Sequence, residues 1–147
     1  MEEYLKPSLI IDKMMATDAF SQWLGIERIT EGPGHCTIQM TTRPEMVNGF
    51  GILHGGITFS FADSAFAFAS NSRGQHAVSV ETSISHLAPG RAGEVLIAVA
   101  SEKHLGKRLA RYEVIVSRQD GTRLALFSGM VFRKKDRWRV TEVRSKK

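Results

Sequence analysis

The sequence has one cysteine, which excludes any disulfide within the 147-residue chain. Cys36 has no neighbours at metal-ligand spacing, so we expect it to be a small packed side chain in a strand and expect no metal site. No apolar run approaches the roughly 20 residues that a membrane-spanning helix requires. The first residues, Met1-Glu2-Glu3, lack the cationic and then apolar order of a secretory signal. These absences favour a protein of the reducing cytoplasm that does not enter membranes.

Internal repeats, low-complexity segments and linkers rich in Pro, Gly or Ser are also missing from the sequence. A length of 147 residues suits a single domain, 1–147, with a core large enough to fold without disulfides or metal. The sequence has neither the Gly-x-Ser-x-Gly elbow of serine hydrolases nor a dinucleotide-binding fingerprint. We therefore expect no cofactor.

The net charge of +5 comes from the end of the chain. Residues 133–147 carry eight Lys and Arg against two acidic residues, whereas residues 1–132 carry 12 basic and 13 acidic residues. With one aromatic, Trp138, this segment lacks the stacking series typical of single-strand binders, so we expect no nucleic-acid partner. We interpret 134–147 as a solvated basic extension beyond a core of about 15–133.

Hydrophobic periodicity and turn residues predict an α+β protein. The expected helices span 8–20 and 54–72, and the expected strands span 25–31, 35–41, 78–86, 94–101, 108–118 and 123–133, with 137–143 as a possible short final strand. One long helix against about six consecutive antiparallel strands requires the sheet to wrap the helix. The edge strands or outer face left open favour an oligomer.

The long helix contains one carboxylate among small residues. When the residues are placed around the helix at 100° each, one broad arc is apolar, and the remaining narrow arc contains the carboxylate. The broad arc consists of Phe59, Phe61, Ala62, Ala65, Phe66, Phe68 and Ala69, and the narrow one of Ser60, Asp63, Ser64, Ala67 and Ser70. Small side chains let another backbone approach, so this stripe is expected to lie against a second sheet, helix or subunit. Asp63 is then either a catalytic or binding carboxylate, or an acid that hydrogen-bonds Ser60 or Ser64 or faces solvent.

Two glycines precede the long helix, in His54-Gly55-Gly56. The first backbone N–H groups of a helix are unsatisfied and lie at the positive end of its dipole, and glycine lets a ligand oxygen come close. Such a site can stabilise the oxyanion that forms when a carbonyl is attacked. Taken alone, His54 is either a structural loop residue or a catalytic base, and Asn48-Gly49 is typical of a turn.

The combination of these motifs is more specific than its parts. Met46-Val47-Asn48-Gly49, His54-Gly55-Gly56 and Ala62-Asp63-Ser64-Ala65 are followed by Val78-Ser79-Val80-Glu81-Thr82-Ser83, Leu87-Ala88-Pro89, Ala92-Gly93-Glu94 and His104-Leu105-Gly106-Lys107-Arg108. Over residues 15 to 133 this order resembles the hotdog-fold acyl-CoA thioesterases of the phenylacetic acid degradation (PaaI-like) type. The resemblance implies a long helix wrapped by an antiparallel sheet, a homodimer as the minimal unit with active sites at its interface, and pairing of dimers into a homotetramer.

The resemblance also implies roles for individual residues. Asp63 matches the catalytic carboxylate, a nucleophile or a general base acting across the interface, and Gly55 matches the amide that receives the thioester carbonyl oxygen. Asn48 matches a residue that positions the nucleophile or water, His54 supports the carbonyl-binding loop, and Ser79 lines the site. The expected substrate- and CoA-binding residues are Gly56, Ser64, Gly106, Lys107 and Arg108.

These features predict an acyl-CoA thioesterase acting on aryl-acetyl or medium-chain acyl groups, with coenzyme A as part of the substrate. The alternative is a non-catalytic acyl-CoA-binding module, although the chain carries no added helix-turn-helix. A hotdog dehydratase or hydratase fits less well, because its His and acid stand in a different motif. The side chains expected to shape the acyl pocket are Phe50, Ile52, Phe59 and Phe66.

Overall fold

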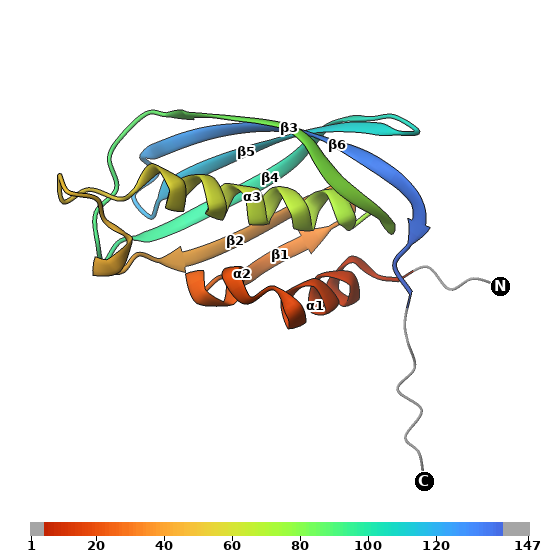
Figure 1. The fold of residues 1–147 in the computed structure, drawn as a ribbon, viewed down its shortest axis with the longest axis horizontal. Coiled ribbons are helices and arrows are strands. Elements are labelled where there is room, and N and C mark those ends of the chain that lie inside the picture. The colour runs from red at the N-terminus through yellow and green to blue at the C-terminus, as the bar shows by residue number, and fades with distance from the viewer. Residues whose placement is uncertain (1–4, 140–147) are drawn as a thin grey trace, which may run out of the picture.

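The computed structural model describes residues 5–139 and shows one long helix lying on a curved sheet (Figure 1). The helices are α1 (Pro7–Thr17), α2 (Ala19–Leu24), a short 3-10 helix (Pro44–Met46) and α3 (Gly55–Asn71). The strands are β1 (Glu27–Gly32), β2 (His35–Thr41), β3 (Gln75–His86), β4 (Val95–Leu105), β5 (Leu109–Arg118) and β6 (Arg123–Arg137). This confirms the predicted α+β order of elements.

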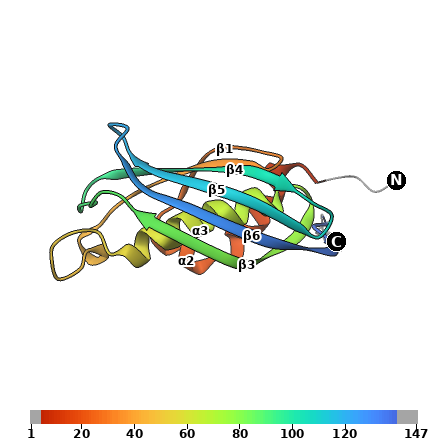
Figure 2. The same cartoon turned by 90° about the horizontal axis from the view of Figure 1, so that it is seen from above.

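The six strands form one antiparallel sheet in the order β1-β2-β4-β5-β6-β3. Seen from above, β4, β5 and β6 run side by side over α3 (Figure 2). The sheet curves around the helix, so that α3 contacts β2, β3, β4, β5 and β6. The predicted wrapping of a single long helix is therefore confirmed.

The core lies between α3 and the inner face of the sheet. The Phe61, Phe66 and Phe68 side chains of α3 are fully buried, and the centroids of the Phe66 ring and the Phe127 ring on β6 lie 5.4 Å apart. A Cβ at Gly129 would lie 2.6 Å from that same Phe66 ring, so β6 needs glycine opposite this ring. Cys36 is packed as predicted, and burial raises the pKa of its thiol to about 12.

The helix predicted over 8–20 is confirmed for residues 8–17 but wrong beyond them, because a second helix begins after Asp18. The Asp18 carboxylate accepts a hydrogen bond from the Ser21 amide at 2.9 Å and thereby caps α2. Ile10 and Ile11 of α1 are fully buried, so the core begins before residue 15. An aspartate at an N-cap is the sequence signal that could have located the break.

Strand structure extends further along residues 134–139 than predicted. Strand β6 continues through the charged run to Arg137, because it pairs with β3 as far as Gln75. Trp138 then stacks on His76 and donates from its indole nitrogen to Asn71 Oδ1 at 3.0 Å. A separate strand does not begin at residue 137, and positions 140–143 of that prediction lie outside the described residues, as do residues 144–147 of the predicted solvated extension.

The two edges of the sheet differ. On β1, Arg28 donates to the Ser8 carbonyl of α1 at 2.9 Å and forms an ion pair with Asp12, so α1 lies against this edge. On β3, a 12-residue strand, most side chains are exposed, including Val78 and Val80. Edge β3 therefore offers an open row of backbone hydrogen-bonding groups. Within residues 5–139 no helix combines the length and the apolar character needed to cross a membrane.

Candidate functional site

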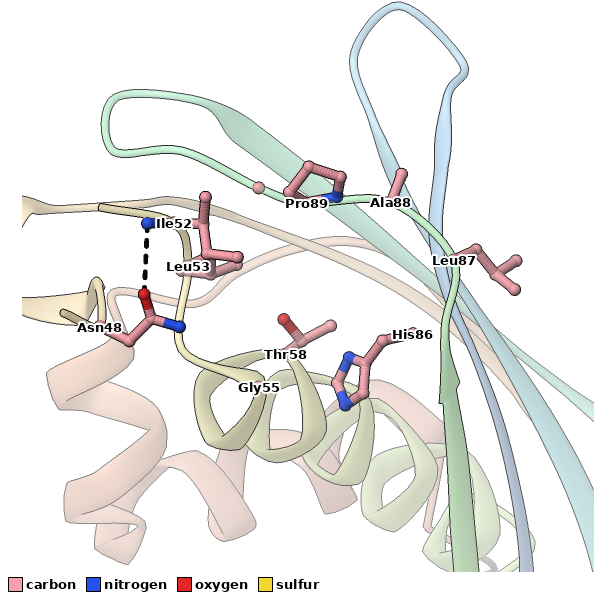
Figure 3. Close-up of a pocket in the computed structure, with 10 residues that line it drawn as sticks. Asn48, Ile52, Leu53, Gly55, Thr58, His86, Leu87, Ala88 and Pro89 are labelled. Carbon is pink, nitrogen blue, oxygen red and sulfur yellow. Dashed lines mark hydrogen bonds between the residues drawn. The ribbon is translucent and has the colours of Figure 1, made fainter. Parts of the chain in front are cut away.

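A pocket of about 460 Å³ opens at the N-terminal end of α3 (Figure 3). Its walls come from the loop before α3, the first turn of α3, the end of β3 and the loop that follows β3. The lining residues are Asn48, Ile52, Leu53, Gly55, Thr58, His86, Leu87, Ala88, Pro89 and Gly90. Two of the predicted site residues, Asn48 and Gly55, thus line a real cavity.

His54 caps the first turn of α3 with its side chain. The Gly56 amide donates to His54 Nδ1 at 3.0 Å, so this ring nitrogen is unprotonated and accepts. The His54 carbonyl accepts from the amides of Ile57 and Thr58, at 2.9 and 3.4 Å. Within the described part of the chain, the Gly55 amide is left without an acceptor and borders the pocket. This free N–H sits at the positive end of the helix dipole, where it can bind a carbonyl oxygen that becomes negative.

The loop before α3 is folded around Asn48. Its Oδ1 accepts from the Phe50 amide at 2.9 Å and from the Ile52 amide at 3.4 Å, the second of which is drawn in Figure 3. These bonds fix the orientation of the carboxamide, and Nδ2 therefore points away from the loop amides as a free donor beside the pocket. Asn48 is therefore a turn residue, as the pair Asn48-Gly49 predicts. Its side chain also supplies a polar donor to the cavity.

Two polar residues of the pocket were missed by the sequence reasoning. Thr58 is 5% exposed, and among residues 5–139 its hydroxyl has no hydrogen-bond partner. His86, at the end of β3, is the only titratable side chain of the lining. A single sequence gives no signal for either one, because both become site residues only when the end of β3 meets the start of α3.

The predicted catalytic acid, Asp63, lies outside this pocket. It is half-buried on α3, eight residues and roughly 12 Å along the helix axis from Gly55. Burial raises the pKa of the Asp63 carboxyl, and the nearby carboxylate of Asp18 raises it further. Neither serine offered as its partner bonds it, since Ser60 donates to the Gly56 carbonyl and Ser64 bonds Ser21. Among the described residues, the Asp63 carboxylate has no hydrogen-bond or ion-pair partner.

The small-residue stripe around Asp63 divides into two parts. Ser64 is buried with its hydroxyl 2.8 Å from the Ser21 hydroxyl, so α2 of the same chain covers that side. Gly56, Ser60, Asp63 and Ala67 are left partly or fully accessible along one line of α3. This remaining line is narrow, made of small side chains, and uncovered by residues 5–139.

The other predicted site residues lie further away. Ser79 is exposed on β3 and shares a strand face with Ala77, which packs against the core. The turn Gly106-Lys107-Arg108 joins β4 to β5 at the far end of the sheet from the pocket (Figure 2). There Arg133 donates to the Gly106 carbonyl at 2.8 Å, and Lys107 is exposed. Neither Lys107 nor Arg108 forms an ion pair with any residue in 5–139.

The expectation for the acyl pocket is only partly met. Ile52 lines the cavity, whereas Phe50 is 90% exposed at the tip of the loop, and Phe59 and Phe66 pack toward Phe127 in the core. The residues that line the pocket in their place are Leu53, Leu87, Ala88 and Pro89. Across the described ranges no group of three His, Cys, Asp or Glu side chains is placed to hold a metal ion.

The chain is similar to known thioesterases in both sequence and structure. The model of the thioesterase superfamily matches residues 50–125. The acyl-coenzyme A thioesterase PaaI of Escherichia coli (strain K12) is 40% identical over 116 residues, 79% of this chain and 83% of that protein. The solved structure of E. coli PaaI from the phenylacetic acid degradation operon has a TM-score of 0.87 at 37% identity, covering 89% of this chain and 95% of the other. The structure of smu.793 from Streptococcus mutans UA159 bound to acetyl CoA has a TM-score of 0.75 at 25% identity, covering 77% and 91%.

The raised pKa of Asp63 predicts that its charge lowers the stability of the fold. Because the folded-state pKa lies above the unfolded one, stability falls as pH rises between the two and stays lower at neutral pH. Asp63→Asn should therefore resist urea better than the wild type at pH 7. The gain should vanish below about pH 4, where the wild-type carboxyl is protonated in both states.

Urea unfolding midpoints at the two pH values measure this difference. Asp120→Asn is the matched control, because the Asp120 carboxyl is exposed and its pKa is lowered by the Thr122 amide that it accepts from. That control should gain no stability at pH 7. A less stable Asp63→Asn at pH 7 would contradict the expectation.

Proposed function

This chain belongs to the thioesterase superfamily, and from that premise we propose that it hydrolyses the thioester bond of an acyl-CoA. The hotdog fold implied by the sequence is confirmed by the sheet, by its helix and by the match to PaaI. The observation that carries the proposal is the free Gly55 amide at the end of a pocket whose other walls are largely apolar. An apolar cavity with one directed donor suits an acyl group and its carbonyl oxygen.

The proposed chemistry needs no cofactor beyond the coenzyme A of the substrate. A thioester carbonyl is already activated, so a carboxylate and one oxyanion-binding amide suffice for its hydrolysis. Gly55 holds the carbonyl oxygen, and Asn48 Nδ2 orients the attacking group. Asp63 acts either as general base toward water or as nucleophile through an anhydride that water then cleaves. We propose aryl-acetyl or medium-chain acyl groups as substrates and the cytoplasm as the location.

We further propose that Asp63 comes from a second copy of the chain. Within one chain Asp63 stands roughly two turns from Gly55, too far to attack a carbonyl held there. The open edge of β3 and the uncovered line of α3 support pairing of two copies through antiparallel β3 strands. Ser79 of β3 lies at this seam, and His54 supports the carbonyl-binding loop by capping α3.

The same pairing supports a role for the distant basic turn. Strand β3 runs from Gln75, near the Lys107 turn, to His86, at the pocket. In an antiparallel pair the Gln75 end of one copy lies beside the His86 end of the other, so this turn approaches the pocket of its partner. Lys107 and Arg108 can then bind the phosphates of coenzyme A. The Gly56 amide and the Ser64 hydroxyl already bond His54 and Ser21, so we propose that other atoms of these two residues contact the substrate.

The outer face of the sheet supports assembly of dimers into a tetramer. Val99 on β4 and Leu126 on β6 flank Ile115 on β5 in one row of the sheet, and both outer members of the row are exposed. Leu109 and Phe132 form a second exposed pair on neighbouring strands. Exposed apolar side chains in register suit a second contact between copies.

Turnover tests the proposal directly. Purified protein incubated with phenylacetyl-CoA, hexanoyl-CoA and acetyl-CoA should release free CoA, measured with a thiol reagent. Asp63→Asn should lower kcat by about 100-fold or more, because the amide can act neither as base nor as nucleophile. Ser60→Ala, a change on the same line of α3, is the control and should retain activity. Tight binding of the esters without release of CoA would favour the non-catalytic binding module instead.

Mixing two inactive variants tests whether the site is shared between copies. Asn48→Ala and Asp63→Asn should each be nearly inactive, whereas an equal mixture refolded together should regain about a quarter of the wild-type activity. Half of the dimers are then mixed, and each mixed dimer restores one of its two sites. If Asn48 and Asp63 of one chain served the same site, the mixture would remain inactive.

The basic turn should matter only for substrates that carry phosphates. Replacing Lys107 and Arg108 together by Ser should raise the KM for the best CoA ester by about tenfold with little change in kcat, because the binding of the phosphates is lost in the ground state and transition state alike. The N-acetylcysteamine thioester of the same acyl group has no phosphate and should be hydrolysed equally by both proteins. Equal loss on both substrates would contradict phosphate binding.

A further inference from the structure

His86 lies against the glycine that carries the free amide. An ideal Cβ at Gly55 would stand 3.3 Å from both Nε2 and Cε1 of the His86 ring and 4.0 Å from Cδ2. The edge of the imidazole that bears Nε2 therefore faces the first residue of α3, as Figure 3 shows from the side. The main chain of His86 is fixed by its pairing with Ala125 on β6, so the ring is carried by a strand and not by a loop.

This spacing lets the amide and the ring bind one oxygen atom together. A Cβ position lies roughly 2.5 Å from the nitrogen of its own residue, so Nε2 is within about 6 Å of the Gly55 nitrogen. Two donor nitrogens that each lie about 2.9 Å from one shared acceptor can themselves be up to about 6 Å apart. A carbonyl oxygen in the pocket can thus accept from both.

Nothing in the described chain competes for the His86 ring. Neither of its nitrogens bonds another residue of 5–139, and the remaining lining of the pocket has no charged side chain. Thr58 lines the same pocket, and its hydroxyl bonds no residue of 5–139, so a second polar group is available there to a ligand.

The charged and titratable groups on the elements packed around His86 are few. On α3 and at its cap these are Asp63, two turns further along, and His54, whose Nδ1 is taken by the Gly56 amide. On β6 the nearest is Arg123, two residues from Ala125, and on β5 it is Arg118, which donates to the Pro89 carbonyl at 3.2 Å. The Arg118 guanidinium is also paired with Glu94 and Asp120.

We propose that His86 is a catalytic residue of this thioesterase, donating from Nε2 a second hydrogen bond to the thioester carbonyl oxygen beside the Gly55 amide. The assignment rests on the proposed function. Both donors strengthen as the carbonyl carbon becomes tetrahedral and its oxygen takes up negative charge, and the proton remains on the imidazole throughout. The bond therefore acts mainly on kcat rather than on binding of the ester.

The test compares His86→Phe, which keeps a planar ring without a donor, with His86→Gln, which keeps a neutral donor. With the best of the three CoA esters, His86→Phe should lower kcat by about 100-fold with KM changed less than threefold, and His86→Gln should recover part of the loss. His35→Phe, an exposed histidine at the start of β2, is the control and should match the wild type. Circular dichroism confirms that each variant is folded.

Recovery in His86→Gln separates hydrogen bonding from a structural role. A ring that only fills space is replaced better by phenylalanine than by glutamine, whereas a hydrogen-bond donor is replaced only by glutamine. The kcat of His86→Gln should therefore exceed that of His86→Phe. A kcat of His86→Gln no higher than that of His86→Phe, or a wild-type kcat in His86→Phe, would overturn the assignment while leaving the thioesterase proposal intact. A wild type that hydrolyses none of the esters would overturn the proposed function itself.

Discussion

The site depends on how one histidine caps the first turn of α3. A helix begins with several amides that have no partner inside it, and here the side chain of His54 takes the amide of Gly56. The amide of Gly55 is left free and borders the pocket. A side chain at Gly55 would press against the His86 ring. Glycine at this position therefore lets the free amide and the imidazole lie next to each other. A single glycine therefore determines both where an oxygen can bind and what stands beside it.

A second constraint is the rigidity of α3 itself. Gly55 and Asp63 are fixed on one helix at a separation that their side chains cannot close. The helix packs against five strands, with three phenylalanines in the core, and this packing keeps Gly55 and Asp63 apart. The Asp63 carboxylate is half-buried and has no partner among residues 5–139, and its pKa is raised, so its charge destabilises the folded chain. The cost is understandable if the acid serves a reaction in the seam between two copies.

Most of the fold follows from local patterns in the sequence, and most of the site does not. The long helix and all six strands were predictable because their periodicity and turn residues agree. The break at Asp18 was missed, although an N-cap aspartate marks it, and β6 was cut short because its last residues are charged while their pairing with β3 is not visible in sequence. Asn48 and Gly55 were found through motifs. His86 and Thr58 were not, because their place in the pocket is created by tertiary packing alone.

The unequal edges of the sheet have a consequence for assembly. Helix α1 is tied to β1 through Arg28, whereas β3 has no such cover among residues 5–139. A sheet with two open edge strands can add further copies at both edges and grow into a fibre. If two copies pair through β3, each covers the open edge of the other, and growth in that direction terminates. Helix α1, which lies against β1, would then prevent a third copy from adding at the opposite edge.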